Sequence, residues 1–209
     1  MREDTSPKFQ GDEKLTAEVL IWGYKNGLFP MANGVDGAIQ WFGPDPRAVL
    51  PLNRFHVSRS LRRRVQSHTF HVTVDQCFTR VVQCCAEVMP GRRETWISPR
   101  MIDAYSTLHG MGFAHSIEAW TNNLCRELVG GLYGVVLGSA FFGESMFSRA
   151  TDASKVCLVH LVEHLRCQGF TLLDTQFTNP HLEQFGVVVI PRSDYLLKLK
   201  KALSVSINW

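Results

Sequence analysis

The chain has 209 residues, of which 45% are hydrophobic and 20% charged, and its formal net charge is +3 at pH 7. This composition supports a sizeable hydrophobic core and excludes a disordered or collagen-like chain, while the small net charge means that any nucleic-acid binding must depend on a local basic patch. The longest uncharged run, residues 128–143, is shorter than the about 20 apolar residues of a membrane-spanning helix. Because the first ten residues are charged and polar, no secretory signal is predicted and we expect a cytoplasmic protein without a membrane span.

The first half of the chain combines helical and strand patterns. Apolar residues recur at helical spacing from residue 15, Ser58 is a good helix cap, and Pro99 suits a first helical turn. Residues 28–47 are broken by prolines and glycines, and they predict turns with one or two short strands. In chain order we expect a helix at 15–26, a strand at 48–52, a helix at 57–67, a strand at 70–75, and helices at 75–89 and 99–110.

The second half predicts antiparallel strands followed by a long helix, which Asp152 is expected to cap and Gly169 to end. The expected elements are strands at 114–120, 126–138 and 139–148, a helix at 152–168, a strand at 169–177, a short helix at 180–185, a strand at 186–191 and a final helix at 192–203. This order is typical of an α+β fold. Because prolines interrupt residues 43–58, we expect a small N-terminal domain, residues 1–50, and a larger domain, residues 51–209.

Polar residues inside two apolar strands indicate a functional site. Strand alternation places Asp174 and Gln176 on one face of their strand, and Glu144 on the same face of its strand as Phe142 and Met146. Burying an unpaired charge is costly, so each acid needs a partner or a catalytic task. We interpret these residues as part of a cleft. The alternative is that the acids are structural and accept hydrogen bonds from backbone donors.

The sequence HLVEH also matches the inverted zinc-peptidase pattern. It places His160 and His164 one helical turn apart, with Glu163 beside them. A catalytic zinc site needs a third protein ligand, which the sequence does not identify. A polar stripe on the helix surface is the simpler interpretation, and a zinc peptidase remains an alternative.

Basic and aromatic residues supply a possible nucleic-acid surface. Arg59, Arg62 and Arg63 share one helix face, and the guanidinium fork suits phosphate oxygens. Trp96 is followed by turn residues, where an exposed ring can stack on a base. The plainer alternatives are a solvated helix face for the arginines and a loop anchored to the core for the tryptophan.

The unit strand, strand, capped helix, strand is central to the acetyltransferase fold. Acetyltransferases bind the pyrophosphate of coenzyme A on a glycine-rich loop at the helix start. Here that segment, SRATDASK, contains no glycine, and Asp152 would repel a pyrophosphate. We therefore expect an acetyltransferase-like (GNAT-type) domain with a mixed sheet, but not coenzyme A as its ligand.

Ordered motifs along the chain indicate a family. They run from about Gly23 to Tyr195 and are GLFP, PDPRAVLPL, TWIS, AHSIEAW, LVGGLYGV, FGESMFSR, ASK, LLDTQ and HLEQFG. In these motifs the chain resembles the leucyl/phenylalanyl-tRNA–protein transferases. The family commonly has a tryptophan directly after FP, whereas this chain has Met31.

The resemblance implies a fold, an activity and partners. Members move leucine, phenylalanine or, less readily, methionine from aminoacyl-tRNA to the N-terminal α-amine of proteins that begin with arginine or lysine, which marks them for N-end rule degradation. Their fold is a small N-terminal domain plus an acetyltransferase-like domain, and they use no metal or coenzyme. We expect a monomer. Transfer to acidic N-termini, another transferase on the same fold and a non-catalytic tRNA-binding module are the alternatives.

The resemblance also implies roles for individual residues. Asp174 would orient Gln176, whose side-chain oxygen would meet the attacking amine, and Glu144 would bind the amine or a cationic acceptor side chain. Trp96 would stack near the 3′-terminal adenosine, and the arginines at 59, 62 and 63 would bind acceptor-stem phosphates. The donor side chain would enter an apolar pocket lined by Leu132, Phe141, Gly143, Leu158, Leu161, Leu165 and Leu173.

Overall fold

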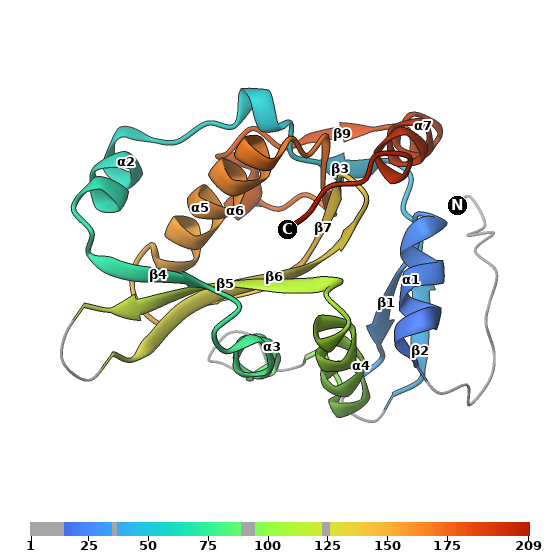
Figure 1. Cartoon of the computed structure of the whole chain (residues 1–209), viewed down its shortest axis with the longest axis horizontal. Helices are drawn as coiled ribbons and strands as arrows, with labels where there is room; N and C mark the ends of the chain where they lie inside the picture. Colours follow the sequence, from blue (N-terminus) through green and yellow to red (C-terminus); the bar gives the residue numbers. More distant parts are fainter. Residues whose placement is uncertain (1–14, 35–36, 89–94, 123–125) are drawn as a thin grey trace.

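A seven-stranded sheet in the order β4-β5-β6-β7-β8-β3-β9 spans the molecule in a computed structural model of the chain (Figure 1). The described residues are 15–34, 37–88, 95–122 and 126–209. The strands of this sheet are β3 (Arg47–Val49), β4 (Phe70–Val74), β5 (Ala114–Thr121), β6 (Leu128–Leu137), β7 (Ala140–Ser148), β8 (Leu172–Gln176) and β9 (Val188–Ile190). A separate two-stranded sheet pairs β1 (Phe29–Ala32) with β2 (Ile39–Phe42).

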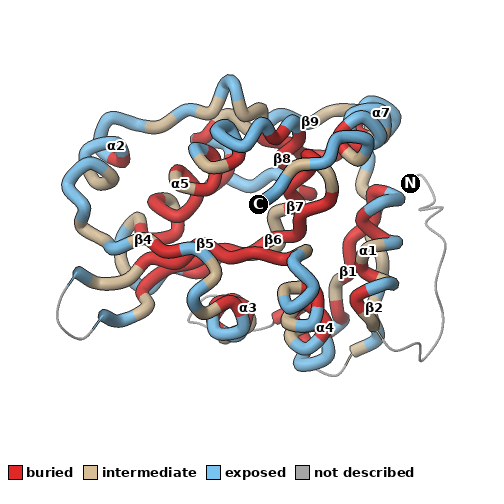
Figure 2. Tube along the Cα trace, in the orientation of Figure 1, coloured by how far each residue is buried: buried red, intermediate tan, exposed pale blue. Residues whose placement is uncertain are grey.

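Helices cover both faces of the large sheet. They are α1 (Ala17–Lys25), α2 (Arg59–Gln66), α3 (Phe78–Ala86), α4 (Pro99–Gly110), α5 (Ala153–Gln168), α6 (Pro180–Glu183) and α7 (Arg192–Leu203), with a short 3-10 turn at Leu52–Arg54. One buried cluster joins the sheet to α1, α3, α4 and α7, and a second joins its other face to α2, α5 and α6. Figure 2 accordingly shows the central strands as buried and α2 as largely exposed.

The sequence predicted most of these elements, and the differences have local causes. The strand expected at 48–52 ends at Val49 because Pro51 follows and a 3-10 turn begins. Ser58 caps α2 as expected, by accepting a hydrogen bond from the Leu61 backbone N–H at 3.3 Å. The end of the helix expected at 75–89 lies partly outside the described residues, since α3 ends at residue 86 and residues 89–94 are not described.

The long helix α5 ends as predicted but begins differently. Gly169 follows it in the left-handed conformation, at φ +84°, which is a common helix ending. Asp152 occupies the N-cap position, but its side chain makes no capping hydrogen bond because its own backbone is left-handed, at φ +66°. Its carboxylate instead forms an ion pair with Lys155 at 3.0 Å. Asp152 is therefore at the predicted N-cap position, but the prediction that its side chain caps the helix was wrong.

A bulge in β7 overturns the predicted alternation of that strand. Tyr133 of β6 pairs with Ser145, and Gly134 pairs with Gly143, so Glu144 is an extra residue between them. One extra residue moves all later side chains to the opposite face. Phe141 and Met146 consequently lie in the α5 cluster, while Phe142 and Phe147 lie in the opposite one.

The strands β7 and β8 separate beyond a short parallel pairing. Only Ala140–Phe142 pair with Leu172–Asp174, although β7 continues to Ser148 and β8 to Gln176. On β8 the predicted alternation is confirmed for Leu172 and Leu173, which belong to opposite clusters. The opening between these two strands lies at the centre of the sheet.

Candidate active site

A cavity of about 640 Å³ lies where β7 and β8 part. Its walls include residues from both faces of the sheet. They are Met31, Trp96, Leu132, Tyr133, Phe141, Gly143, Glu144, Ser145, Met146, Phe147, Ser148, Ser154, Leu158, Leu161, Leu173, Thr175, Gln176, Phe177, Asn179, Pro180, His181 and Leu182. Most of this lining is apolar, and within the described residues it includes one carboxylate and no arginine or lysine. Such a cavity suits an apolar group with a reacting polar centre at one edge.

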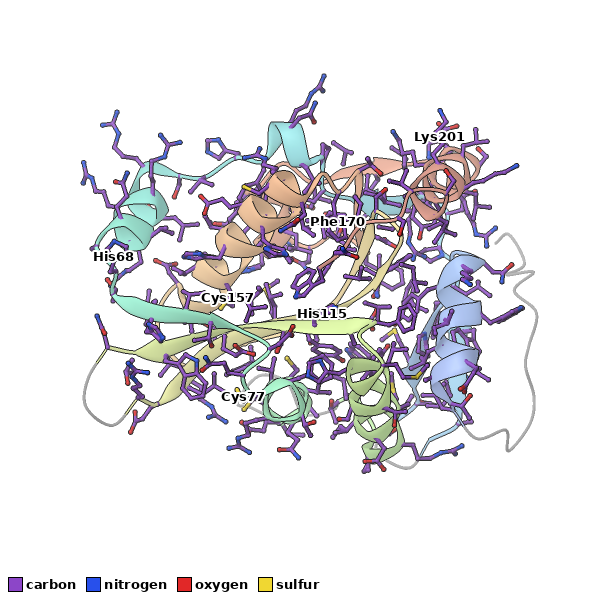
Figure 3. The ribbon with its side chains drawn as sticks, in the orientation of Figure 1. His68, Cys77, His115, Cys157, Phe170 and Lys201 are labelled. Atoms are coloured by element: carbon purple, nitrogen blue, oxygen red, sulfur yellow. The ribbon has the colours of Figure 1, made fainter. Side chains whose placement is uncertain are left out.

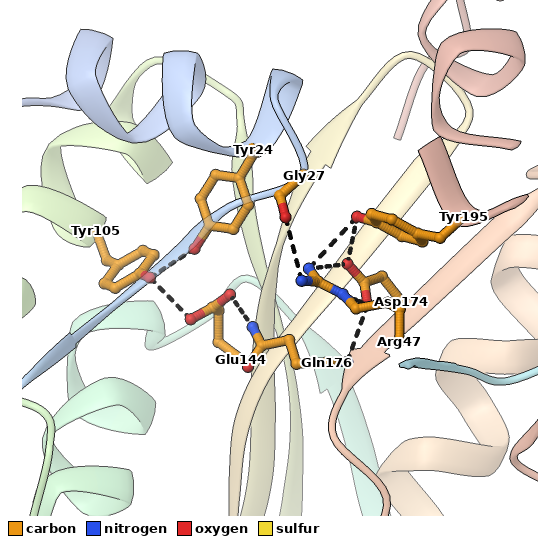
Figure 4. A network of polar contacts seen from close by, with 8 residues as sticks. All are labelled: Tyr24, Gly27, Arg47, Tyr105, Glu144, Asp174, Gln176 and Tyr195. Carbon is orange, nitrogen blue, oxygen red and sulfur yellow. Dashed lines mark hydrogen bonds and ion pairs between the residues drawn. The ribbon is translucent and has the colours of Figure 1, made fainter. Parts of the chain in front are cut away.

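Asp174 is buried and fully paired beside this cavity (Figure 4). Its carboxylate accepts hydrogen bonds from Nε and Nη2 of Arg47, at 2.9 and 2.6 Å, and from the Tyr195 hydroxyl at 2.7 Å. It also accepts the Gln176 backbone N–H at 2.9 Å. Burial and the nearby Asp174 charge raise the pKa of Tyr195 well above its usual value, so this hydroxyl remains a donor. Asp174 therefore holds the backbone of Gln176 in place.

Arg47 ties this carboxylate to the N-terminal part of the chain. Its side chain is 1% exposed, and it also donates to the Gly27 carbonyl at 3.2 Å. The guanidinium carbon lies 4.7 Å from the centre of the Phe29 ring and 4.5 Å from that of Tyr195, which are distances typical of cation–π contacts. The buried ion pair is thus enclosed by aromatic rings and further hydrogen bonds, which is the setting that a buried charge requires.

Gln176 has an unusual backbone and a fixed amide. Its φ is +65°, a left-handed conformation that L-residues with side chains rarely adopt, and this turns β8 away from strand geometry. Its Nε2 donates to Oε1 of Glu144 at 2.7 Å. The other amide atom, Oε1, accepts no hydrogen bond from the described residues. Because Gln176 lines the cavity, this oxygen is an acceptor for a bound ligand.

Glu144 is the single carboxylate in the cavity wall. Besides the Gln176 amide, it accepts a hydrogen bond from the Tyr105 hydroxyl at 2.8 Å, and that hydroxyl in turn lies 2.6 Å from the hydroxyl of Tyr24. Burial raises the pKa of Glu144 to about 8, against the opposing effect of the tyrosine hydrogen bonds. Within the described residues no ion pair neutralises it. A carboxyl with this pKa exchanges a proton readily near neutral pH.

The structure places six of the seven predicted pocket residues in the cavity wall, namely Leu132, Phe141, Gly143, Leu158, Leu161 and Leu173. Leu165 is fully buried in the same cluster but does not line the cavity. Trp96 lines the cavity together with Met31. Gly134 lets the Phe141 ring lie over β6, since a β-carbon there would overlap that ring.

Several residues of the site were missed by the sequence reasoning. Arg47, Tyr24, Tyr105 and Tyr195 complete the network around the two carboxylates, but they come from elements far away in the chain. The one available signal was an arginine directly before the apolar run AVL, since such an arginine must be paired if the run is buried. Met146 was missed because the β7 bulge was not predicted.

Two sets of predicted residues lie outside this cavity, the arginines of α2 and the histidines of the HLVEH sequence on α5. Arg59, Arg62 and Arg63 are exposed on α2, which packs against α5. His160 and His164 lie in different surroundings, because His160 lines a smaller second cavity whereas the His164 ring lies 4.5 Å from that of Trp209.

Within the described residues, the group of three side chains close enough to share a metal ion is Asp75, His109 and His115. Neither histidine of the HLVEH sequence belongs to it. The arrangement required by the zinc-peptidase alternative is therefore not formed.

Comparison with known families decides the assignment. A family model described as leucyl/phenylalanyl-tRNA protein transferase matches residues 49–200, and one for the N-terminal domain of the same transferase matches residues 13–45. The chain belongs to the leucyl/phenylalanyl-tRNA–protein transferase family. Membership makes it an enzyme of the aminoacyltransferase class and replaces the zinc-peptidase alternative. The strand Arg47–Val49 begins between the two matched segments and ends at the first residue of the second, and it pairs within the large sheet.

Relatives with this family name are similar over nearly the whole chain. One from Salinibacter ruber is 52% identical over 94% of this chain and 84% of its own length. One from Maricaulis maris is 54% identical over 90% of this chain and 86% of its own length. One from Herpetosiphon aurantiacus is 53% identical over 93% and 97% respectively.

Solved structures of other proteins resemble this transferase more weakly. L-PGS from Bacillus licheniformis has a TM-score of 0.48 at 11% identity, covering 89% of this chain and 70% of its own. A GCN5-related glucosamine N-acetyltransferase region of a fungal multi-domain enzyme has a TM-score of 0.49 at 10% identity, covering 90% of this chain and 24% of its own. The topology of the chain itself is the α+β arrangement with a mixed sheet that the sequence predicted. Within the described residues, no helix is long and apolar enough to cross a membrane.

Proposed function

We propose that this chain transfers leucine or phenylalanine, and less readily methionine, from charged tRNA to the α-amine of proteins that begin with arginine or lysine. The observation that carries the proposal is the apolar cavity at the β7–β8 opening, with Glu144 hydrogen-bonded to Gln176 at its wall. We further propose that the product is marked for N-end rule degradation, and that the enzyme is a cytoplasmic monomer.

The donor side chain would occupy the apolar part of the cavity. Leu158 and Leu161 approach from α5, and Leu132, Phe141 and Met146 approach from the sheet. Apolar walls favour apolar side chains of matching size without a branch at the β-carbon, and they exclude polar side chains by the cost of desolvation. Burial of such a side chain positions the ester carbonyl at the polar edge, next to Gln176.

The reaction requires no further activation, because an aminoacyl ester already has a good leaving group. The acceptor α-ammonium loses a proton, and its nitrogen attacks the ester carbonyl carbon. The nitrogen of the tetrahedral intermediate loses a second proton, the bond from carbon to ribose oxygen breaks, and that oxygen takes up a proton, so that one proton is released overall. The products are a peptide bond and deacylated tRNA. Positioning and proton acceptance are what the protein must supply.

Glu144 and Gln176 fit these two tasks. The α-amino group has an ordinary pKa of about 7.7–8.0, and burial raises the pKa of Glu144 to about 8, so transfer of a proton between them is nearly balanced. The Gln176 Oε1 atom would accept a hydrogen bond from the same amine, which aims its lone pair at the carbonyl. Asp174 would act through Gln176 by holding its backbone, at 2.9 Å from the amide nitrogen.

The charge of the cavity favours a cationic acceptor over an acidic one. Its described lining includes Glu144 and no arginine or lysine that would pair with an acidic side chain. An N-terminal arginine or lysine brings a compensating positive charge near this carboxylate, whereas an aspartate or glutamate would be repelled.

The tRNA would be held outside the apolar part of the cavity. Trp96 borders the cavity and would stack on the 3′-terminal adenosine, with Met31 beside it in place of the second ring common in the family. Arg59, Arg62 and Arg63, exposed on α2, would bind phosphates of the acceptor stem.

A transfer assay tests the proposal directly. The protein is mixed with charged leucyl- or phenylalanyl-tRNA and with peptides that begin with Arg, Lys, Asp or Glu but are otherwise identical. We expect the labelled amino acid on the Arg and Lys peptides only. Transfer to the acidic peptides alone would reverse the acceptor assignment, and transfer to none of them would refute the enzymatic proposal.

A further inference from the structure

A second cavity lies on the outer side of α5, between α2 and β4. Its volume is about 240 Å³. The residues that line it are Arg64, Val65, His68, Phe70, His71, Val72, Asn122, Val156 and His160. Figure 3 labels His68 at the point where α2 leads into β4. We call this space the anion cavity.

The polar side chains of the anion cavity are hydrogen-bond donors with few partners of their own. The Arg64 guanidinium and the rings of His68, His71 and His160 make no hydrogen bond or ion pair with any part of the chain that the structure describes. The amide of Asn122 donates to the His68 carbonyl at 3.2 Å. Among the described residues no carboxylate lines the cavity, although exposed Glu163 lies on α5 just beyond His160. The convergence of a guanidinium, three imidazoles and an amide, with no carboxylate in the described lining, favours an anionic ligand.

A metal ion does not fit this donor set. The described group of metal-capable side chains that lie close enough together is Asp75, His109 and His115, none of which lines the anion cavity. The three imidazoles of the cavity are therefore too far apart to share an ion. An arginine is also a poor neighbour for a cation, whereas its planar fork matches the oxygens of a phosphoryl group.

A bound anion would change the charge of His160. Burial lowers its pKa, Glu163 raises it, and His68 lowers it again. The uncharged ring is therefore favoured when the cavity holds no anion. A bound phosphoryl group would favour the charged ring and would strengthen its hydrogen bond to it.

The anion cavity adjoins the arginine face of α2 that we propose to bind the tRNA. Arg64 follows directly after the exposed Arg62 and Arg63, so the same helix carries a basic outer face and contributes to the cavity. Helix α5 separates the two cavities, with Leu158 and Leu161 in the larger one and His160 in the smaller one. An α-helix with its side chains is about 10–12 Å across. A few nucleotides of single-stranded RNA can span that distance.

We propose that the anion cavity binds a phosphoryl group of the donor tRNA, at the junction between its acceptor stem and its 3′ end. This inference rests on the proposed function. The phosphoryl group is either the 5′-terminal phosphate of the tRNA or a backbone phosphodiester. Both present oxygens to Arg64 and His160, and both lie outside the part of the donor that enters the larger cavity.

The test compares two donors with the same aminoacyl ester. One is full-length phenylalanyl-tRNA, and the other is the 3′-phenylalanyl ester of adenosine, which is too small to reach the anion cavity. In Arg64→Gln and in His160→Asn, we expect kcat/KM to fall about tenfold for the tRNA and to remain unchanged for the adenosine ester. Arg80→Gln is the matched control, because Arg80 is an exposed arginine on α3, across the sheet, and should affect neither donor.

Removal of the 5′-phosphate distinguishes the two sources. If the terminal phosphate occupies the cavity, the kcat/KM of the wild-type enzyme should also fall about tenfold when the phenylalanyl-tRNA is dephosphorylated. The kcat/KM of Arg64→Gln should then show no further loss. If a backbone phosphate occupies it, dephosphorylation changes neither protein. In that case the slope of log affinity for tRNA against log salt concentration should be shallower in Arg64→Gln, by about the amount that one phosphate contact contributes.

Two outcomes would overturn the proposal. In the first, both cavity variants use charged tRNA with the kcat/KM of the wild type. In the second, kcat/KM falls equally with tRNA and with the adenosine ester, which would make the residues structural. Failure of the proposed function has a different signature, namely no transfer by wild-type enzyme from either donor. The anion cavity is then judged by the affinity of wild type and Arg64→Gln for deacylated tRNA, and equal affinities would refute it.

Discussion

The two carboxylates beside the β7–β8 opening have opposite surroundings. Asp174, on β8, is completely buried, pairs with Nε and Nη2 of Arg47 and accepts a hydrogen bond from the Tyr195 hydroxyl. Among the described residues Glu144, on β7, accepts hydrogen bonds from neutral groups only, and burial raises its pKa to about 8. The first carboxylate is fixed by its ion pair as part of the frame. The second is able to gain and lose a proton under working conditions, and Gln176 links the two.

This difference separates a residue that positions from one that reacts. An ion pair in a buried site fixes geometry but cannot exchange protons cheaply, because either partner alone would be an uncompensated buried charge. A carboxyl surrounded by hydroxyl and amide groups is free to change its charge.

Arg47→Met should unfold much of the population, because it leaves the Asp174 charge buried without its partner. Loss of one member of a buried ion pair typically costs about 3–5 kcal/mol of unfolding free energy. Urea denaturation followed by circular dichroism measures this change. The matched control is the double variant Arg47→Met with Asp174→Leu, which should recover most of the stability but none of the activity. A single variant as stable as wild type would contradict the assigned role of the pair.

Glu144→Gln should retain the fold and lose turnover, because an amide cannot accept the proton of the attacking amine. General-base catalysis typically contributes a factor of about 100 to 10,000, and we expect a loss of kcat on the order of 1,000-fold. The pH profile provides the specific readout. In wild type, kcat/KM should depend on two ionisations near pH 8, that of Glu144, with its pKa of about 8, and that of the acceptor amine, and only the amine's should remain in the variant. The same two ionisations in both proteins would exclude Glu144 as the proton acceptor.

The same carboxyl makes stability depend on pH. The pKa of Glu144 in the folded protein, about 8, lies above its ordinary value of 4.5, so the folded state binds the proton more tightly. Its contribution to stability is fully present below about pH 4.5 and is lost as the pH rises through about 8. Unfolding free energies measured by urea titration between pH 5 and pH 9 should therefore decline in wild type by more than in Glu144→Gln.

Gln176→Ala should reduce kcat on the order of 100-fold, since loss of one positioning contact misaligns the nucleophile. The affinity for tRNA should change much less. Gln176→Gly is the control for the backbone, because glycine adopts a φ of +65° without strain. The glycine variant should be more stable than the alanine variant by about 1 kcal/mol and equally inactive. Equal losses in tRNA binding and turnover would mean that Gln176 is only structural.

Leu161→Phe should have the smallest effect, a change of preference rather than of activity. A larger side chain in the cavity wall should favour leucine over phenylalanine donors by about tenfold, the usual scale for small changes of size in an apolar pocket. Competition between the two charged tRNAs measures the ratio. Leu165→Val is the control, because Leu165 is buried in the same cluster without lining the cavity. It should lower stability and leave the ratio unchanged, and a shift of that ratio would extend the pocket beyond its present wall.

Local patterns in the sequence predicted the strand around Asp174 better than the strand around Glu144. Alternation in β8 was sufficient to place Asp174 inside the protein, because that strand is regular up to Asp174. Its partner Arg47 is 127 residues away, and no local pattern reports a contact of that separation. In β7 the bulge at Glu144 reversed the later faces, so the alternation rule failed there. The left-handed backbone of Gln176 was equally hidden, since glutamine gives no signal for it.

The parallel seam between β7 and β8 also has a consequence for the order of folding. Glu144 and Gln176 are separated by 32 residues, and α5 must cross over the sheet before the two strands can pair. The antiparallel strands β5, β6 and β7 are consecutive neighbours and can assemble from local contacts, whereas the seam must wait for closure of this long loop. A partly folded chain can therefore contain most of the sheet without a working site. Transfer activity would then report the completed fold rather than the presence of secondary structure.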